Sequence, residues 1–265
     1  MTEIRLYQVD AFTDAVFGGN PAAVCPLDAW LPDTTLQTIA AENNLSETAF
    51  FVPEDGGYRL RWFTPAVEVE LCGHATLASA YVIATYIDPA MERVLFHSAS
   101  GPLTVSREGD VFTLDFPSEP PAVFTDGGAV AKALGIVPQE VLKAPKVDGG
   151  KIMAVLADEA EVRAAAPDLA KVKALPGDGL IITAEGDEVD FVSRYFAPHA
   201  GIPEDPVTGS AHVVLTPYWA KRLGKAKLAA RQVSSRLGEL QVEDKGGRTL
   251  ISGKVAPFLE GRIRV

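Results

Sequence analysis

The sequence predicts an α+β protein built from two similar domains, and three observations support this prediction. Short strand-like runs dominate the 265-residue chain, recognisable helices are fewer, and an internal repeat keeps its order along the chain. A proline-rich segment follows Phe116 and interrupts the pattern, so we place a linker near residues 117–127. The predicted domains are therefore residues 1–118 and 119–265, with a C-terminal strand that either completes the second domain or returns to the first.

The elements are predicted from residue type and spacing. Runs rich in β-branched and aromatic residues, bounded by Gly, Pro and Asp, predict strands that begin at Ile4, Glu47, Tyr58, Gly101 and Val111. Helical spacing predicts a first helix with Asp33 as its N-cap and a second helix that begins at Gly73. A later helix begins near Gly209 and should kink at Pro217, because proline has no N–H to offer the Val213 carbonyl.

The internal repeat consists of three pairs of matching segments. The segments that begin at Gly18, Arg61 and Cys72 match, in the same order, those that begin at Gly149, Arg194 and Thr208. Each copy reads as a strand, a proline turn, a loop and the small-residue start of an apolar helix. If the copies pack about a pseudo-twofold axis, both helix N-termini face one cleft. Their free N–H groups and partial positive charge suit a carboxylate.

Composition excludes several classes of function. The chain has 24 Lys and Arg against 35 Asp and Glu, a net charge of −11, which disfavours nucleic acid or an anionic membrane as partner. The two cysteines, Cys25 and Cys72, do not form a disulfide framework or a zinc-ligand spacing. The sequence shows no signal peptide and no membrane span, so we expect a cytoplasmic protein that acts on a small molecule.

Glu47 is the first candidate for proton chemistry. It stands between Ser46 and Thr48, directly before an apolar run, where burial would raise the pKa of a carboxyl group from about 4.3 toward neutrality. The repeat places Leu180 at the equivalent position, which predicts one carboxylate and an asymmetric site. An ordinary exposed glutamate at the end of a strand is the alternative.

The two helix starts supply the other candidates. His74 follows Gly73, and the positive helix end favours a neutral imidazole there. Asp205 is suited to bind an amine or polarise a hydroxyl, and Ser210, with nearby backbone N–H groups, is suited to hold a carboxylate. Helix capping and packing are the alternatives for these three residues. The remaining histidines show no ligand spacing with His74, so we expect no metal.

Four motifs together resemble the phenazine-biosynthesis-like PhzF family. They read DAFTDAVFGGNPAAVCPLD, NNLSETAFF, RWFTPAVEVELCGHATLASAYVI and DPVTGSAH, and they extend over residues 10–212. The resemblance implies a diaminopimelate epimerase-like fold of two pseudo-symmetric domains, each a curled β-sheet or barrel around a central helix. It also implies a cleft between the domains as the active site, a homodimer, and catalysis without a cofactor.

The resemblance further implies roles for individual residues. Glu47 becomes the general acid/base of an isomerase that moves a proton between carbons of a small, cyclic amino or hydroxy carboxylate, as in trans-2,3-dihydro-3-hydroxyanthranilate isomerase. The predicted substrate-binding residues are His74, Asp205, Ser210, Gly73, Gly209, Thr208, Ser46 and Asn20.

Two alternative functions stay open at this point. One is an amino-acid racemase or epimerase that uses Cys72, and the other is a non-catalytic protein that binds a metabolite or a partner. Related epimerases have one cysteine in each half, whereas the second copy here carries Thr208. This difference favours isomerisation over inversion.

Overall fold

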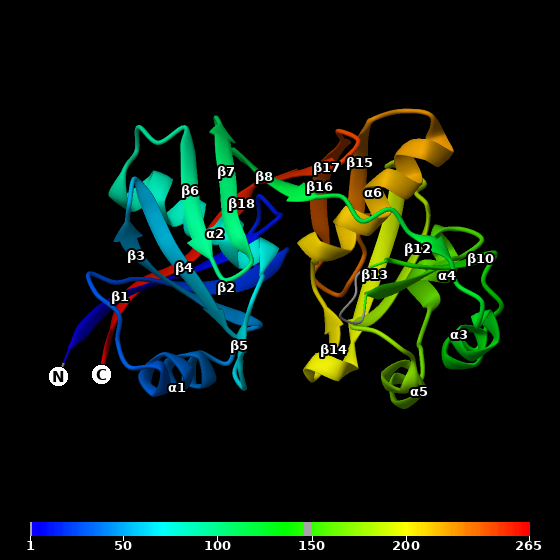
Figure 1. Cartoon of the computed structure of the whole chain (residues 1–265), viewed down its shortest axis with the longest axis horizontal. Helices are drawn as coiled ribbons and strands as arrows, with labels where there is room; N and C mark the ends of the chain where they lie inside the picture. The colour runs from blue at the N-terminus through cyan, green and yellow to red at the C-terminus, as the bar shows by residue number, and fades with distance from the viewer. Residues whose placement is uncertain (1, 146–149) are drawn as a thin grey trace. The chain divides into compact units, whose positions relative to one another are not determined.

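The computed structural model describes residues 2–145 and 150–265, and the chain forms two compact units. One unit comprises Met1–Asp115 and Ser252–Val265, and the other Phe116–Ile251 (Figure 1). The strands are β1 (Glu3–Ala11), β2 (Asn20–Pro26), β3 (Glu47–Glu54), β4 (Gly57–Phe63), β5 (Glu68–Val69), β6 (Arg93–Ser98), β7 (Gly101–Glu108), β8 (Val111–Pro117), β9 (Ala122–Val123), β10 (Glu140–Lys143), β11 (Lys151–Val155), β12 (Gly179–Glu185), β13 (Phe191–Ala197), β14 (Ile202–Asp205), β15 (Lys227–Gln232), β16 (Gly238–Asp244), β17 (Arg248–Gly253) and β18 (Val255–Arg264). The helices are α1 (Asp33–Asn43), α2 (Gly73–Val82), α3 (Gly127–Leu134), α4 (Glu159–Ala164), α5 (Leu169–Ala174) and α6 (Gly209–Leu223), with a π-helix η1 (Ile83–Ile87) and a 3₁₀ helix η2 (Pro198–Ala200). The predicted α+β class is confirmed.

The sheet of the first unit mixes parallel and antiparallel pairs. Strand β1 pairs antiparallel with both β2 and β18, and β2 then pairs parallel with β3. The sheet continues through β4, β6, β7 and β8. Because the β1–β18 ladder runs from Glu3↔Arg264 to Ala11↔Val255, the C-terminal strand is part of the first unit.

Helix α2 is the core of the first unit. Every residue of this helix except Tyr81 is buried, and the helix contacts β1, β2, β3, β7 and β18. A helix that is buried on nearly all faces must be surrounded by protein. The sheet therefore curls around α2, as the ribbon shows (Figure 1).

The second unit repeats the topology of the first. The series β2, β3, β4, β6 and β7 has the same alternation of parallel and antiparallel neighbours as β11, β12, β13, β15 and β16. In each copy a long buried helix lies between the third and fourth of these strands, α2 in the first and α6 in the second. The internal repeat is thus a structural duplication.

The ladders correct the predicted alignment of the first pair of segments. Leu27 N donates to Phe51 O and Leu156 N donates to Thr183 O, both at 2.9 Å, so Leu27 and Leu156 are equivalent. The alignment that started at Gly18 and Gly149 would instead place Leu27 opposite residue 158, so it was shifted by two residues. Gly149 itself lies outside the described residues.

The same ladders correct the residue opposite Glu47. Phe63 and Phe196 are equivalent, because they occupy the same place in RWFTP and RYFAP. Thr48 pairs with Phe63 and Leu180 pairs with Phe196, so Leu180 is equivalent to Thr48. The counterpart of Glu47 is then Gly179, which has no side chain. The predicted alignment was wrong because one residue is inserted between β12 and β13 relative to the loop between β3 and β4. The two halves still differ, since only the first has a carboxylate at this position.

The expected N-cap of the first helix is wrong, whereas the kink expected at Pro217 stays a prediction. Asp33 is not the N-cap of α1: the cap position is Pro32, and the Asp33 carboxylate pairs with Arg61 at 2.9 Å. Pro217 lies inside α6, which continues to Leu223. The carbonyl of Val213 is satisfied by the backbone N–H of Glu119 at 2.9 Å, so the proline leaves no buried acceptor without a partner.

Candidate active site

Four predicted or considered residues meet in the first unit, because neighbouring elements begin there. Asn20 opens β2, Glu47 opens the parallel strand β3, and Cys72 and His74 lie at the start of α2. His74 Nε2 lies 3.2 Å from Glu47 Oε2, and His74 Nδ1 lies 3.2 Å from Asn20 Nδ2. The thiol Sγ of Cys72 is 3.5 Å from the same Nδ1. The imidazole therefore connects the carboxylate with the amide and the thiol.

His74 is neutral in this cluster. Burial lowers its pKa to about 3, against the opposing effect of a hydrogen bond with the Pro21 backbone. The predicted neutral imidazole is confirmed, although burial is the larger cause and the helix end was the expected one. A neutral His74 beside Glu47 forms no ion pair with it.

The cluster also contains three types of metal ligand. One donor atom each from Glu47, Cys72 and His74 lies within 4.8 Å of the others. However, Cys72 approaches Nδ1 of the imidazole and Glu47 approaches Nε2, and a histidine binds an ion through one nitrogen at a time. The arrangement therefore does not suit a single ion held by all three residues.

The second unit gathers a separate polar group at the equivalent helix start. The hydroxyl of Thr208 donates to the Asp205 carboxylate, and both residues are buried. Gln232 Oε1 accepts from Thr208 N at 2.8 Å, and its Nε2 donates to Asp205 O at 2.7 Å and to Thr208 Oγ1 at 3.1 Å. Gln232 is fully buried. This amide fixes the turn that positions Asp205.

Sequence reasoning missed Gln232, although a signal was present. In β15 the buried positions alternate as Leu228, Ala230 and Gln232. A glutamine at the third core-facing position of a strand requires polar partners, because an unpaired buried amide is costly. That alternation could have predicted a buried polar contact, but the partners lie more than twenty residues earlier in the chain.

The remaining predicted residues have different surroundings. Gly73 and Gly209 are buried first residues of α2 and α6, and neither helix has a side-chain N-cap bond. Ser210 is half-buried, and its hydroxyl makes no hydrogen bond with any described residue. Ser46 is half-buried before β3 and likewise has no hydrogen bond among the described residues. Gly209 and Ser210 thus leave donors available, whereas nothing ties Ser46 to the cluster around His74.

The buried histidines predict a specific acid sensitivity. Burial lowers the pKa of His212 from 6.5 to about 4, against a Thr208 backbone hydrogen bond that raises it. Between these pH values the unfolded chain binds a proton that the folded chain does not, so the free energy of unfolding falls as pH is lowered. We expect His212 to contribute a loss on the order of 3 kcal/mol over this interval.

Urea unfolding at pH 7 and pH 4.5 checks this expectation. His212→Asn can still donate to the Thr208 carbonyl, which lies 2.8 Å from His212 Nδ1, but it cannot titrate. The variant should lose less stability on acidification than the wild type, and the exposed His199→Asn should behave as the wild type does. An unchanged acid dependence in His212→Asn would contradict the assignment.

Comparison with known proteins gives the family and the fold of the chain. The family model PhzC-PhzF, described as phenazine biosynthesis-like protein, matches residues 9–261. An uncharacterized isomerase of Pseudomonas aeruginosa is 52% identical over 263 residues, covering 99% of this chain and 100% of the relative. The crystal structure of a PhzF family protein from Enterococcus faecalis has a TM-score of 0.95 at 47% identity and covers 100% of both chains. A hydroxyproline epimerase of Agrobacterium vitis shares the fold at a TM-score of 0.61 and 10% identity, over 98% of this chain and 92% of the epimerase.

Fold and relatives together define the class of protein, which is that of isomerases on the epimerase-like fold. The predicted diaminopimelate epimerase-like architecture is confirmed. Within that class the chain belongs to the PhzC-PhzF family.

Proposed function

We propose that the protein is a cofactor-independent isomerase that transfers a proton between two carbons of a small carboxylate, with Glu47 as the general acid/base. The observation that carries the proposal is the contact between Glu47 and a buried, neutral His74. The substrate class is a cyclic carboxylate with an amino or hydroxy substituent. Gly179 at the equivalent position of the second unit supports a mechanism with one carboxylate.

The proposed reaction uses the carboxylate twice. Glu47 removes a proton from carbon, and the electron pair of the broken C–H bond moves into the adjacent π-system. Glu47 then returns the proton to another carbon, so the double bond shifts and no atom is gained or lost. The N–H groups at the start of α2, at Gly73, support negative charge that develops during transfer.

The other predicted residues have supporting roles in the proposal. Asn20 orients His74 through the contact at Nδ1, and His74 in turn orients Glu47. In the second unit, Asp205 and the unbonded hydroxyl of Ser210 are proposed to bind polar groups of the substrate, while Thr208 holds Asp205. A role for Ser46 in substrate binding stays a prediction.

A racemase that uses Cys72 is the second candidate, and one observation favours it. The thiol lies 3.5 Å from His74 Nδ1, close enough to exchange a proton with the imidazole. Inversion at one carbon by two bases requires a base on each side of that carbon. The equivalent helix start carries Thr208, whose hydroxyl is already bonded to Asp205, and this argues for isomerisation.

Proton NMR in deuterated water distinguishes these candidates. Wild-type protein and Cys72→Ser are incubated with a panel of cyclic and acyclic amino and hydroxy carboxylates. Isomerisation predicts migration of a double bond in both proteins. Inversion at a stereocentre, with deuterium entering at that carbon only when Cys72 is present, would instead establish the racemase. Binding shifts without chemical change for any member of the panel would favour a non-catalytic binding protein.

The cellular location and the oligomeric state of the protein are predicted from fewer observations. Among residues 2–145 and 150–265, no helix combines the length and apolarity that a membrane crossing requires. Neither Cys25 nor Cys72 forms a disulfide, and both side chains are buried. Location in the cytoplasm and a homodimeric state stay predictions, and sedimentation velocity checks the second of them.

A further inference from the structure

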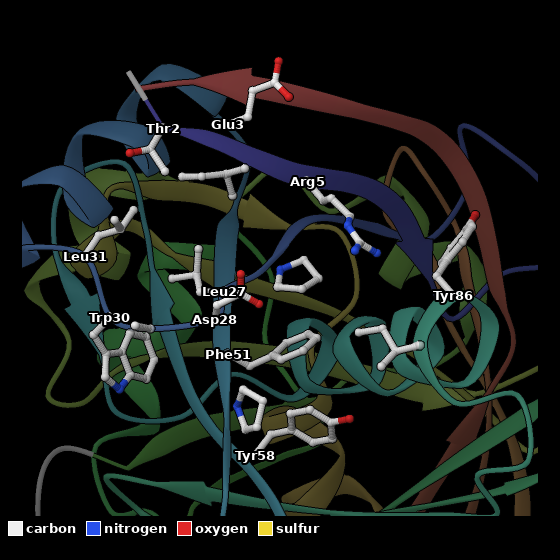
Figure 2. Close-up of a pocket in the computed structure, with 15 residues that line it drawn as sticks. Thr2, Glu3, Arg5, Leu27, Asp28, Trp30, Leu31, Phe51, Tyr58 and Tyr86 are labelled. Atoms are coloured by element: carbon white, nitrogen blue, oxygen red, sulfur yellow. The ribbon is translucent and has the colours of Figure 1, made fainter.

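A second concave site lies within the first unit, away from the Glu47 cluster. Its volume is about 680 Å³, within the range of small-molecule pockets. The lining comes from β1, the segment after β2, the ends of β3 and β4, and the π-helix η1 (Figure 2). Five segments of the first unit thus contribute to one pocket.

The pocket is separate from the proposed active site. Strands β2 and β3 begin at Asn20 and Glu47, whereas the pocket is lined by their other ends, at Pro26 and Phe51. Phe51 is four residue steps along β3 from Glu47, which corresponds to about 13 Å at the usual rise per residue. The His74 neighbours named above, Asn20, Glu47 and Cys72, are not among the lining residues.

Aromatic rings form much of the wall. Phe51 and Tyr58 pack edge to face with their centroids 5.1 Å apart. Trp30 keeps 36% of its surface exposed, and Tyr86 of η1 stacks on Tyr7 at 4.4 Å. A π-helix is a rare distortion that occurs often at functional sites. Here it brings Tyr86 to the pocket, so the wall suits a flat, apolar group.

The charged side chains at the pocket favour a ligand that has one anionic and one cationic group. Arg5 has no acidic partner among the described residues, and it lies directly across the β1–β18 ladder from Arg262. The nearby Glu3 is shared between Arg262 and Arg264, at 3.0 and 3.3 Å. The guanidinium of Arg5 therefore lacks a counter-ion on a protein whose net charge is −11.

Asp28 supplies the opposite charge in the same pocket. Its carboxylate is exposed and forms no ion pair or hydrogen bond with another described residue. Figure 2 shows the Arg5 guanidinium and the Asp28 carboxylate among the lining side chains, together with Phe51 and Tyr58. The pocket thus offers one free cation, one free anion and an aromatic wall within the described part of the first unit.

We infer that this pocket binds a free amino acid with an aromatic side chain. Arg5 holds the α-carboxylate, for which a guanidinium provides a fitting pair of donors. Asp28 accepts from the α-ammonium group, and the aromatic side chain packs against Tyr58 and Trp30. The inference is independent of the proposed isomerase activity, because no residue of the Glu47 cluster takes part.

Calorimetric titration of the full chain with L-phenylalanine and L-tyrosine tests the inference. We expect saturable binding, accompanied by a change in the fluorescence of Trp30, since Trp62 and Trp219 are only 1% exposed. Phenylpropionate, which lacks the ammonium group, and phenylethylamine, which lacks the carboxylate, should each bind at least about tenfold more weakly. These truncated probes test both charges on the wild-type protein, without any risk of misfolding.

Variants then assign the charges to residues. Arg5→Gln and Asp28→Asn should each weaken phenylalanine binding by at least about tenfold. Arg93→Gln, at an exposed arginine outside this pocket, and Glu47→Gln should leave binding unchanged. The inference is overturned if no amino acid binds at about 10 mM, or if Arg5→Gln binds as the wild type does. It is equally overturned if sedimentation shows that Tyr58→Ala splits a dimer, because a second copy would then occupy the pocket.

Discussion

We expect Glu47→Gln to lower kcat by about 10² to 10⁴-fold, which is the range for loss of a general acid/base. Glutamine keeps the length and shape of the side chain, and its amide can still lie against His74 Nε2, now 3.2 Å from the carboxylate. It cannot carry a proton to or from carbon. The loss should therefore appear in kcat, with little change in KM, when turnover of the substrate found by NMR is measured.

A matched control exists on the same strand. Glu54 closes β3 at the end opposite Glu47 and is exposed, so Glu54→Gln removes one charge from the same element without touching the cluster. Its kcat should equal that of the wild type. Glu47→Asp should retain part of the activity, because the acid is kept but withdrawn by one methylene. If Glu47→Gln turns over within about threefold of the wild type, Glu47 is not the acid/base.

Neutral His74 adds a condition on the pH profile of this reaction. The pKa of His74 lies at about 3, so the imidazole does not change charge between pH 5 and 9. Any acidic limb of kcat/KM in that interval must therefore come from a group other than His74. Loss of this limb in Glu47→Gln, with the residual rate independent of pH, would support the assignment.

Much of this molecule could be predicted from the sequence because the signals are local. The strand that begins at Glu47 and the helix that begins at Gly73 follow from apolar runs and small-residue starts, and both are present. The repeat was also visible, since RWFTP and RYFAP occupy equivalent places in β4 and β13. In such motifs, a few neighbouring residues are enough to show which side chains are buried.

The parts that failed depend on contacts between distant segments. The alignment of the segments that begin at Gly18 and Gly149 was wrong by two residues, because only the β2–β3 and β11–β12 ladders reveal the true register. Asp33 was predicted as a cap from its type alone, but the competing partner Arg61 lies 28 residues away. Sequence also cannot say that Glu119 would supply the hydrogen bond lost at Pro217.

The candidate site shows the same division. His74 and Glu47 were each recognisable, but their contact across β3 and α2 required the fold. Gln232 was overlooked because its three hydrogen bonds all go to residues in the β14–α6 turn. The buried Gln232 side chain holds the turn that positions Asp205. We therefore expect its replacement to lower the free energy of unfolding strongly.

Gln232→Leu should destabilise the second unit by about 4 kcal/mol. The two side chains have similar volume, so the change removes polar partners without opening a large cavity. The N–H of Thr208 and the carbonyl of Asp205 would then be buried without the bonds that Gln232 now makes at 2.8 and 2.7 Å. Each such group costs about 1–3 kcal/mol when it loses its partner.

Urea unfolding, together with amide exchange over residues 209–216, measures this effect. The control is Gln241→Leu on the neighbouring strand β16, where the glutamine is exposed and the same substitution should change stability by less than about 0.5 kcal/mol. Exchange at the start of α6 should accelerate in Gln232→Leu and not in the control, since the turn that begins this helix loses its anchor. An equally stable Gln232→Leu would show that Asp205 and Thr208 hold the turn by their own hydrogen bond, and that the amide is dispensable for the geometry of the second unit.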